Sequence, residues 1–103
     1  MELNEAAFDA YKRGLAIARM AAPEKQAKRI RAAGDRLEQE TDPVRQRVLM
    51  VETIKANIEG LRQSPLRNSP ACREAKRALD LMKGFLEAGL KMHDFRPTPY
   101  PNN

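Results

Sequence analysis

The only cysteine of the sequence, Cys72, is the residue whose position best suits chemistry. It falls in the first turn of a predicted helix and is followed directly by Arg73. A helix N-terminus and an adjacent guanidinium both stabilise the thiolate, which is the reactive form of cysteine. However, Cys72 shares an apolar stripe with Ala75 and Leu79, and a buried cysteine is usually inert packing. We therefore interpret Cys72 as a structural residue and keep a redox sensor as the alternative.

Beyond Cys72, the sequence holds no recognisable catalytic or metal-binding set. It has one histidine, His93, so a catalytic triad or a histidine-based metal site lacks its usual second member. It contains no glycine-rich phosphate loop, no Cys-x-x-Cys pair and no His-Glu-x-x-His motif. We therefore expect a protein that is not an enzyme and that carries no metal, cofactor or catalytic residue.

Basic residues on one predicted helix form a candidate surface for phosphates or for an acidic partner. Lys25, Arg29 and Arg36 share one side of this helix at spacings of four and seven residues, with Lys28 nearby. Such a row can follow the phosphates of a nucleic acid or an acidic protein surface. Acidic residues crowd the opposite flank, so an ordinary solvated face explains the pattern as well.

The last predicted helix carries a second and sparser basic row, at Arg73, Arg77 and Lys91. Binding of nucleic acid gains support if the fold places the two rows side by side. Segment 23–61 also contains two helices joined by a tight turn, as a helix-turn-helix does. The second of these helices is too apolar to present polar groups to bases, which argues against a recognition helix.

The rest of the chain is organised around segment 42–61, which predicts a helix with two usable faces. Asp42 suits the N-cap position, and Pro43 suits the first helical position, where its missing N–H costs nothing. Apolar residues then recur at intervals of three and four, which predicts one buried stripe. The stripe consists of Val44, Val48, Val51, Ile54, Ile58 and Leu61.

The opposite side of this helix is a candidate partner-binding face formed by Leu49, Ala56 and Gly60, beside Thr53. Ala56 and Gly60 are small and four residues apart, so another backbone can approach them closely. We predict that another helix, a second subunit or a partner protein packs here. The alternative is an exposed leucine with incidental small neighbours, which is common on protein surfaces.

Three further helices are predicted, over Asn4–Ala21, from Pro23 to about Glu40, and from Pro70 onward after a Ser69 cap. The apolar stripe of the first is Phe8, Tyr11, Leu15, Ala18 and Ala22. The stripe of the second is thinner, with Ala27, Ile30, Ala33, Gly34 and Leu37. The stripe of the last is the widest and is centred on Cys72, Ala75, Leu79, Met82, Leu86 and Leu90. Its outward face predicts the ion pairs Lys76–Asp80, Lys83–Glu87 and Glu87–Lys91.

The fold expected from these elements is all-α, a compact bundle of about four helices in a single domain over residues 1–92. Residues 93–103 predict an extended Pro-rich tail, because three prolines recur there at alternate positions. Such a tail is either a loose terminus or a recognition segment anchored by Phe95 and Tyr100.

Composition narrows the context and the partners. The net charge is +5, from 19 basic and 14 acidic residues, which favours an acidic partner. One cysteine and no long apolar run predict a soluble, cytoplasmic protein without a membrane segment. The core is lean, so self-association as a homodimer is expected. We predict a binding protein that acts as an adaptor, regulator or inhibitor, with a nucleic-acid-binding accessory protein as the alternative.

Overall fold

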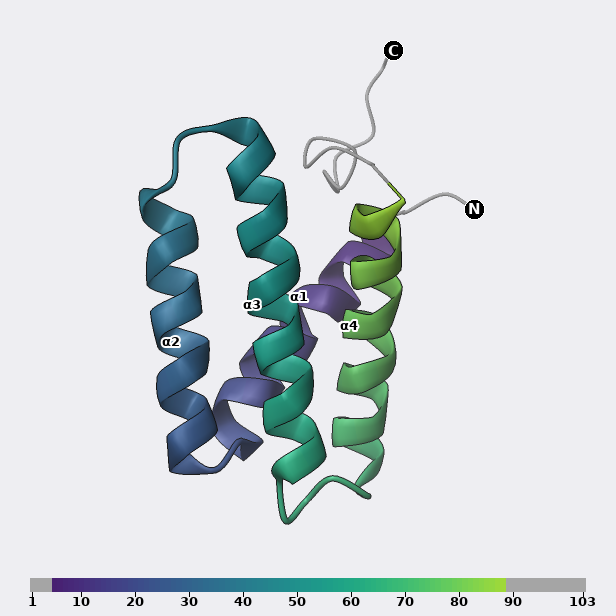
Figure 1. Ribbon diagram of the computed structural model, residues 1–103. Helices are drawn as coiled ribbons and strands as arrows, with labels where there is room; N and C mark the ends of the chain where they lie inside the picture. Colours follow the sequence, from purple (N-terminus) through teal and green to yellow (C-terminus); the bar gives the residue numbers. More distant parts are fainter. Residues whose placement is uncertain (1–4, 89–103) are drawn as a thin grey trace.

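The computed structural model of the protein describes residues 5–88, and four helices run through this part of the chain (Figure 1). They are α1 (Glu5–Ala21), α2 (Glu24–Gln39), α3 (Pro43–Gln63) and α4 (Pro70–Glu87). Residues 5–88 include no strand, so the predicted all-α bundle of four helices is confirmed. The predicted tail at 93–103, His93, Leu90, Lys91 and the domain boundary at residue 92 lie outside the described residues.

Two helices begin with the N-cap residue and the first-turn proline that the sequence predicts. The Asp42 carboxylate accepts a hydrogen bond from the Arg45 N–H at 3.3 Å, and Pro43 occupies the first turn of α3. The Ser69 hydroxyl accepts from the Cys72 N–H at 3.2 Å, and a proline again opens α4. Each cap satisfies an amide that has no partner within its own helix, so these helix starts depend on neighbouring residues alone.

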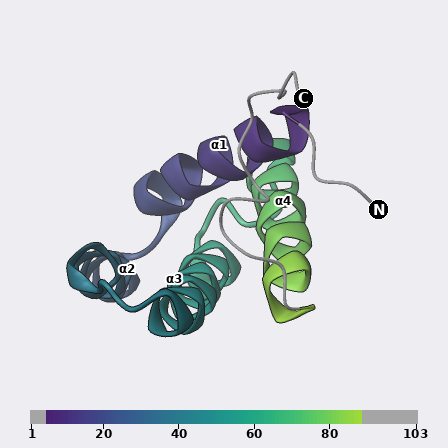
Figure 2. The same cartoon turned by 90° about the horizontal axis from the view of Figure 1, so that it is seen from above.

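The helices form two layers. Helices α2, α3 and α4 stand side by side, with α3 in the middle, and α1 crosses behind them (Figure 1). In the view from above, α1 lies along the back of the layer and reaches α4 at its N-terminal end (Figure 2). Helix α1 packs mainly against α4, and α2 packs mainly against α3. The front of the α2–α3–α4 layer is therefore left uncovered by α1.

One apolar cluster, drawn from α1, α3 and α4, makes up the main core. Leu79 and Ile54 are completely buried at its centre, and the wide stripe of α4 supplies about half of its members. No fully buried member comes from α2, although Leu37 of α2 packs against the edge of the cluster. The buried members are Tyr11, Ala18, Met50, Ile54, Leu61, Cys72, Ala75, Leu79, Met82, Phe85 and Leu86.

Two glycines lie at close contacts between neighbouring helices. A Cβ atom added to Gly60 of α3 would lie 2.8 Å from the Cβ of Ala22 and 3.1 Å from Cδ1 of Ile30. A Cβ added to Gly14 of α1 would lie 3.1 Å from the carbonyl oxygen of Ala75. These two glycines therefore set how near α2 can come to α3 and how near α1 can come to α4.

The predicted buried stripe of α3 is wrong at its N-terminal end. Val44 is 69 % exposed and Val48 is 56 % exposed. Both valines belong to the first turns of α3, and the start of this helix rises beyond the ends of α2 and α4 (Figure 1). Farther along, Ile54 and Leu61 are buried as predicted, and Val51 and Ile58 pack partly buried against the core. The buried side of α3 is wider than the predicted stripe, because it also includes Met50, Thr53, Asn57 and Gly60.

Two polar residues lie on the buried side of α3, and their donors bond within the helix. The Thr53 hydroxyl donates to the Leu49 carbonyl at 2.8 Å, and the Asn57 side-chain amide donates to the Thr53 carbonyl at 2.7 Å. Bonding back to the carbonyl four residues earlier supplies each of these donors with a partner inside the helix. Polar side chains can therefore occupy positions that a hydrophobic stripe would assign to the surface.

Candidate anion-binding face

The front of the α2–α3–α4 layer contains three connected hollows. The first, the α2–α3 groove, has a volume of about 460 Å³. Arg29 and Arg36 of α2 and Lys55 of α3 supply its positive charge. Glu52 and Glu59 of α3 supply its negative charge, and small side chains such as Ala32 and Ala56 form much of the remaining lining.

The second hollow, the α3–α4 groove, has a volume of about 410 Å³. Two of its cations come from α3 and two from α4, and two carboxylates lie among them. Its lining consists of Lys55, Ile58, Glu59, Arg62, Lys76, Asp80 and Lys83. Basic groups outnumber acidic ones here by two to one.

The third hollow, the junction pocket, lies where the α3–α4 connection meets both helices and has a volume of about 240 Å³. It contains four cations and no carboxylate, which distinguishes it from the two grooves. The buried side chains of Leu61 and Cys72 contribute its apolar part. Its polar lining consists of Arg62, Arg67, Asn68, Arg73 and Lys76.

Shared residues join the three hollows into one surface. Lys55 and Glu59 line both grooves, while Arg62 and Lys76 line both the α3–α4 groove and the junction pocket. We call this surface the basic face. Its eight cations are Arg29, Arg36, Lys55, Arg62, Arg67, Arg73, Lys76 and Lys83.

The basic face accounts for the net charge of the chain. Its eight cations exceed its three carboxylates, Glu52, Glu59 and Asp80, by five, which equals the net charge of +5. The other 11 basic and 11 acidic residues of the sequence balance each other. A concentration of one sign in hollows of the surface raises the local potential, which attracts groups of the opposite sign.

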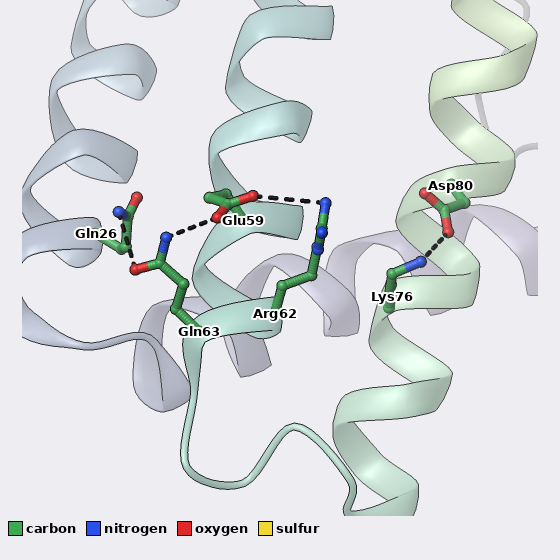
Figure 3. Close-up of polar contacts among 6 residues, drawn as sticks. All are labelled: Gln26, Glu59, Arg62, Gln63, Lys76 and Asp80. Atoms are coloured by element: carbon green, nitrogen blue, oxygen red, sulfur yellow. Dashed lines mark hydrogen bonds and ion pairs between the residues drawn. The ribbon is translucent and has the colours of Figure 1, made fainter.

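Hydrogen bonds connect α2 to the centre of the basic face (Figure 3). The Gln26 side-chain amide, which belongs to a residue only 4 % exposed, donates to the Gln63 side-chain oxygen at 3.2 Å. The Gln63 amide donates to one oxygen of Glu59 at 2.6 Å, and the other oxygen of Glu59 lies 3.8 Å from the Arg62 guanidinium. Arg62 extends beside α3 toward α4, where Lys76 and Asp80 are paired at 2.9 Å (Figure 3). Glu59 thus orients both Gln63, which is hydrogen-bonded to α2, and Arg62, which is a cation of the basic face.

The ion pairs of the face are weak enough to exchange partners. The predicted pairs Lys76–Asp80 and Lys83–Glu87 are confirmed at 2.9 and 3.2 Å, and the predicted Glu87–Lys91 pair lies outside the described residues. The paired side chains are 29–49 % exposed, and pairs of this kind contribute at most about 1 kcal/mol each. A ligand of negative charge can therefore compete with the carboxylates for these cations.

The structure unites part of the two surfaces that the sequence predicts. Arg29 and Arg36 line the same groove as Ala56. Lys25 and Lys28 are exposed on α2 but line none of the three hollows. The predicted row is thus divided between the basic face and the rest of α2.

The other members of the predicted partner-binding face are covered to different degrees. Gly60 is buried against α2, so the close approach that its size permits is used within the chain. Leu49 is half-buried and lines none of the hollows. Among these residues, only Ala56 contributes to the basic face.

The two predicted basic rows are not adjacent, because α3 stands between α2 and α4 (Figure 2). Cations of α3 lie between the two rows, and these cations were not predicted from the sequence. Lys55 and Arg62 are seven residues apart and therefore share one side of α3, and this spacing could have revealed them. Arg67 belongs to the loop, and no periodic signal could have located it. Helices α2 and α3 lie side by side and nearly antiparallel, unlike the angled pair of a helix-turn-helix (Figure 1).

Two titratable groups lie in the apolar core. Burial raises the pKa of the Tyr11 phenol to about 12. Cys72 is 3 % exposed and belongs to the core cluster, as expected of a packing cysteine. Among residues 5–88, no group of three or more His, Cys, Asp or Glu side chains is arranged to hold a metal ion.

Comparisons of the chain with family models, with curated proteins and with solved structures found no match. None of the helices described here has the length and apolar character needed to cross a membrane. The geometry and charge of the basic face are therefore the observations on which a function can be argued.

Proposed function

We propose that the protein is a non-enzymatic binding protein whose basic face holds an acidic segment of another protein. In this role it would act as an adaptor, regulator or inhibitor. The distribution of charge supports the proposal most directly, because eight cations and only three carboxylates line the three connected hollows. Complementary charge speeds the encounter with a partner and fixes its orientation.

The mixture of charges within the grooves favours a protein partner. Glu59 and Asp80 lie among the cations of the α3–α4 groove. They would repel a continuous phosphate backbone, whereas a protein segment can place its own basic groups opposite them. In addition, none of the residues that line the three hollows is aromatic, so bases of a single strand have no side chain on which to stack.

Nucleic acid is the second candidate ligand, and one observation favours it. Cations run across α2, α3, the loop and α4, so the basic surface is much wider than the single helical row predicted from the sequence. A duplex could contact such a surface through its phosphates without reading bases.

Two matched double variants on α2 test the basic face. Arg29→Gln with Arg36→Gln removes two cations of the α2–α3 groove, whereas Lys25→Gln with Lys28→Gln removes two exposed cations of the same helix outside it. The probes are a fluorescent glutamate-rich peptide and a mixed-sequence DNA duplex, measured by anisotropy over a salt series. We expect the peptide to bind, and the arginine variant to weaken binding about five- to tenfold, as two exposed charge contacts would. The lysine variant should change the affinity by less than about twofold.

Each alternative predicts a different result in this experiment. Equal losses in the two double variants would show that net charge alone governs binding, and they would refute a defined face. Tighter binding of the duplex than of the peptide, with a steep dependence on salt, would favour nucleic acid. The absence of binding to both probes at low salt would reject both candidates, since screening is weakest there.

The cytoplasmic location and self-association also form part of the proposal. A single buried cysteine suits a reducing compartment. Val44 and Val48 are exposed one helical turn apart on α3, where they offer apolar surface to a second copy. Leu49, which is half-buried on the same helix, stays a predicted contact for such a partner.

A further inference from the structure

The junction pocket differs from the two grooves in its chemistry. Four cations surround a volume of about 240 Å³, and no carboxylate lines it. We propose that this pocket binds a single phosphate monoester, carried on a side chain of the acidic partner. The identity of the carrier rests on the proposed function, whereas the affinity of the pocket for phosphate does not.

Two cations of the junction pocket, Arg67 and Arg73, have N–H donors that a ligand can use. Arg67 and Arg73 form no ion pair with any described residue, and both are exposed. The Arg67 guanidinium uses one N–H to donate to the Ser64 carbonyl at 3.2 Å, which leaves the others of its five donors. Arginine forks match phosphate oxygens in pairs, and charge-assisted bonds of this kind are stronger than neutral ones.

The loop that carries Arg67 is ordered by its own hydrogen bonds. Ser64 is completely buried, and its hydroxyl accepts from the Leu66 N–H at 3.0 Å. The Ser64 carbonyl accepts from the Arg67 N–H at 3.1 Å, and the Leu66 carbonyl accepts from the Ser69 N–H at 2.9 Å. Because the loop is already held in place, binding needs less ordering of the backbone.

The number and arrangement of the cations favour a monoester over a nucleic-acid backbone. A phosphorylated side chain carries a charge of about −1.5 to −2 at neutral pH and presents three oxygens. The junction pocket is lined by four cations and no carboxylate within a small volume, which suits such a concentrated charge. A duplex carries one charge for each phosphate and distributes them along its backbone. Its neighbouring phosphates would meet Glu59 and Asp80 in the adjoining groove.

The test compares three peptides on the full-length chain. They are glutamate-rich and identical except at one central position, which is serine, glutamate or phosphoserine. We expect the phosphoserine peptide to bind about tenfold more tightly than the other two in an anisotropy titration. Arg67→Gln with Arg73→Gln should abolish that gain, whereas Lys25→Gln with Lys28→Gln, which removes the same charge elsewhere, should preserve it. Circular dichroism checks that the double variants remain folded.

Three results would overturn the inference. They are equal affinities for the three peptides, a phosphoserine gain that survives Arg67→Gln with Arg73→Gln, and tighter binding of a DNA duplex at the same residues. If the serine peptide binds and depends on Arg29 and Arg36 while phosphoserine adds nothing, the proposed function stands and this inference fails.

Inorganic phosphate tests the pocket without any partner. Titrated into the isotopically labelled protein, it should shift the backbone amide signals of Arg67, Asn68 and Arg73 more than those of Lys25 and Lys28. Shifts confined to the junction pocket would support the site even if no acidic peptide bound and the proposed function failed. Uniform or absent shifts would refute it.

Discussion

The two sides of α3 pack in different ways. Toward α1 and α4, it contributes Met50, Ile54 and Leu61 to a single apolar cluster. Toward α2, Gly60 faces Ala22 and Ile30 without room for a Cβ atom, and a hydrogen bond joins Gln26 to Gln63. Full burial of a large apolar side chain contributes about 1.5–3 kcal/mol to stability.

The candidate site lies along both interfaces of α3. The α3–α4 pair combines the apolar core that it shares with α1 with an open groove lined by Arg62 and Lys83. The α2–α3 pair combines buried Ile30 and Ala33 with an open groove, whose wall is free to carry Arg29 and Arg36. Each interface of α3 thus pairs a buried apolar side with a charged outer groove.

The largest expected effect is the loss of stability when a core side chain is truncated, compared with truncation of a side chain that packs α2 against α3. Leu79→Ala should lower the free energy of unfolding by about 2–5 kcal/mol, because it leaves a cavity at a completely buried position. Ile30→Ala removes a side chain that is 1 % exposed but belongs to α2. We expect Ile30→Ala to reduce hydrogen-exchange protection mainly in α2, whereas Leu79→Ala should reduce it in all four helices. Equal losses everywhere for Ile30→Ala would show that α2 unfolds only together with the core.

A smaller loss of folding stability is expected at high pH, because the phenol of Tyr11 is buried in the core. The Tyr11 pKa is raised in the folded state from 10.0 to about 12, so the neutral phenol contributes stability that is fully present below pH 10. That stability is lost as the pH rises from 10 toward about 12, by an amount on the order of 2–3 kcal/mol. Urea denaturation at several pH values should show wild type losing stability relative to Tyr11→Phe across this range. A constant difference between the two proteins would contradict the burial of the phenol.

The smallest effect tests the close contact between α2 and α3. Gly60→Ala should destabilise the fold by about 1–2 kcal/mol, because overpacking against Ala22 and Ile30 outweighs the gain in helix propensity. Gly84→Ala is the matched control, since a Cβ at Gly84 of α4 meets nothing within 4 Å. It should stabilise the protein by about 0.5–1 kcal/mol. Thermal unfolding measures both, and two stabilised variants would mean that α2 can move away from α3 at little cost.

Local patterns predicted much of the fold but little of the candidate site. The stripe of α4 is buried as predicted from Cys72 to Leu86, because its apolar arc is wide and regular. The stripe of α3 is predicted less well, since Val44 and Val48 have the right spacing but are exposed. Of the predicted basic row, Arg29 and Arg36 reach the basic face, while Lys25 and Lys28 do not. Helical spacing alone could not show where the grooves lie.

The sequence by itself determined the four helices, the caps of α3 and α4 and the buried arc of α4. Each of these depends on residues within a few positions of one another, such as Asp42 with Pro43 and Ser69 with Cys72. Only the tertiary structure decided which side of α3 is buried, because that helix has neighbours on several sides. It also decided the assembly of the basic face. Arg36 and Arg73 are distant in sequence, and they lie on the same surface only because α2 and α4 both pack against α3.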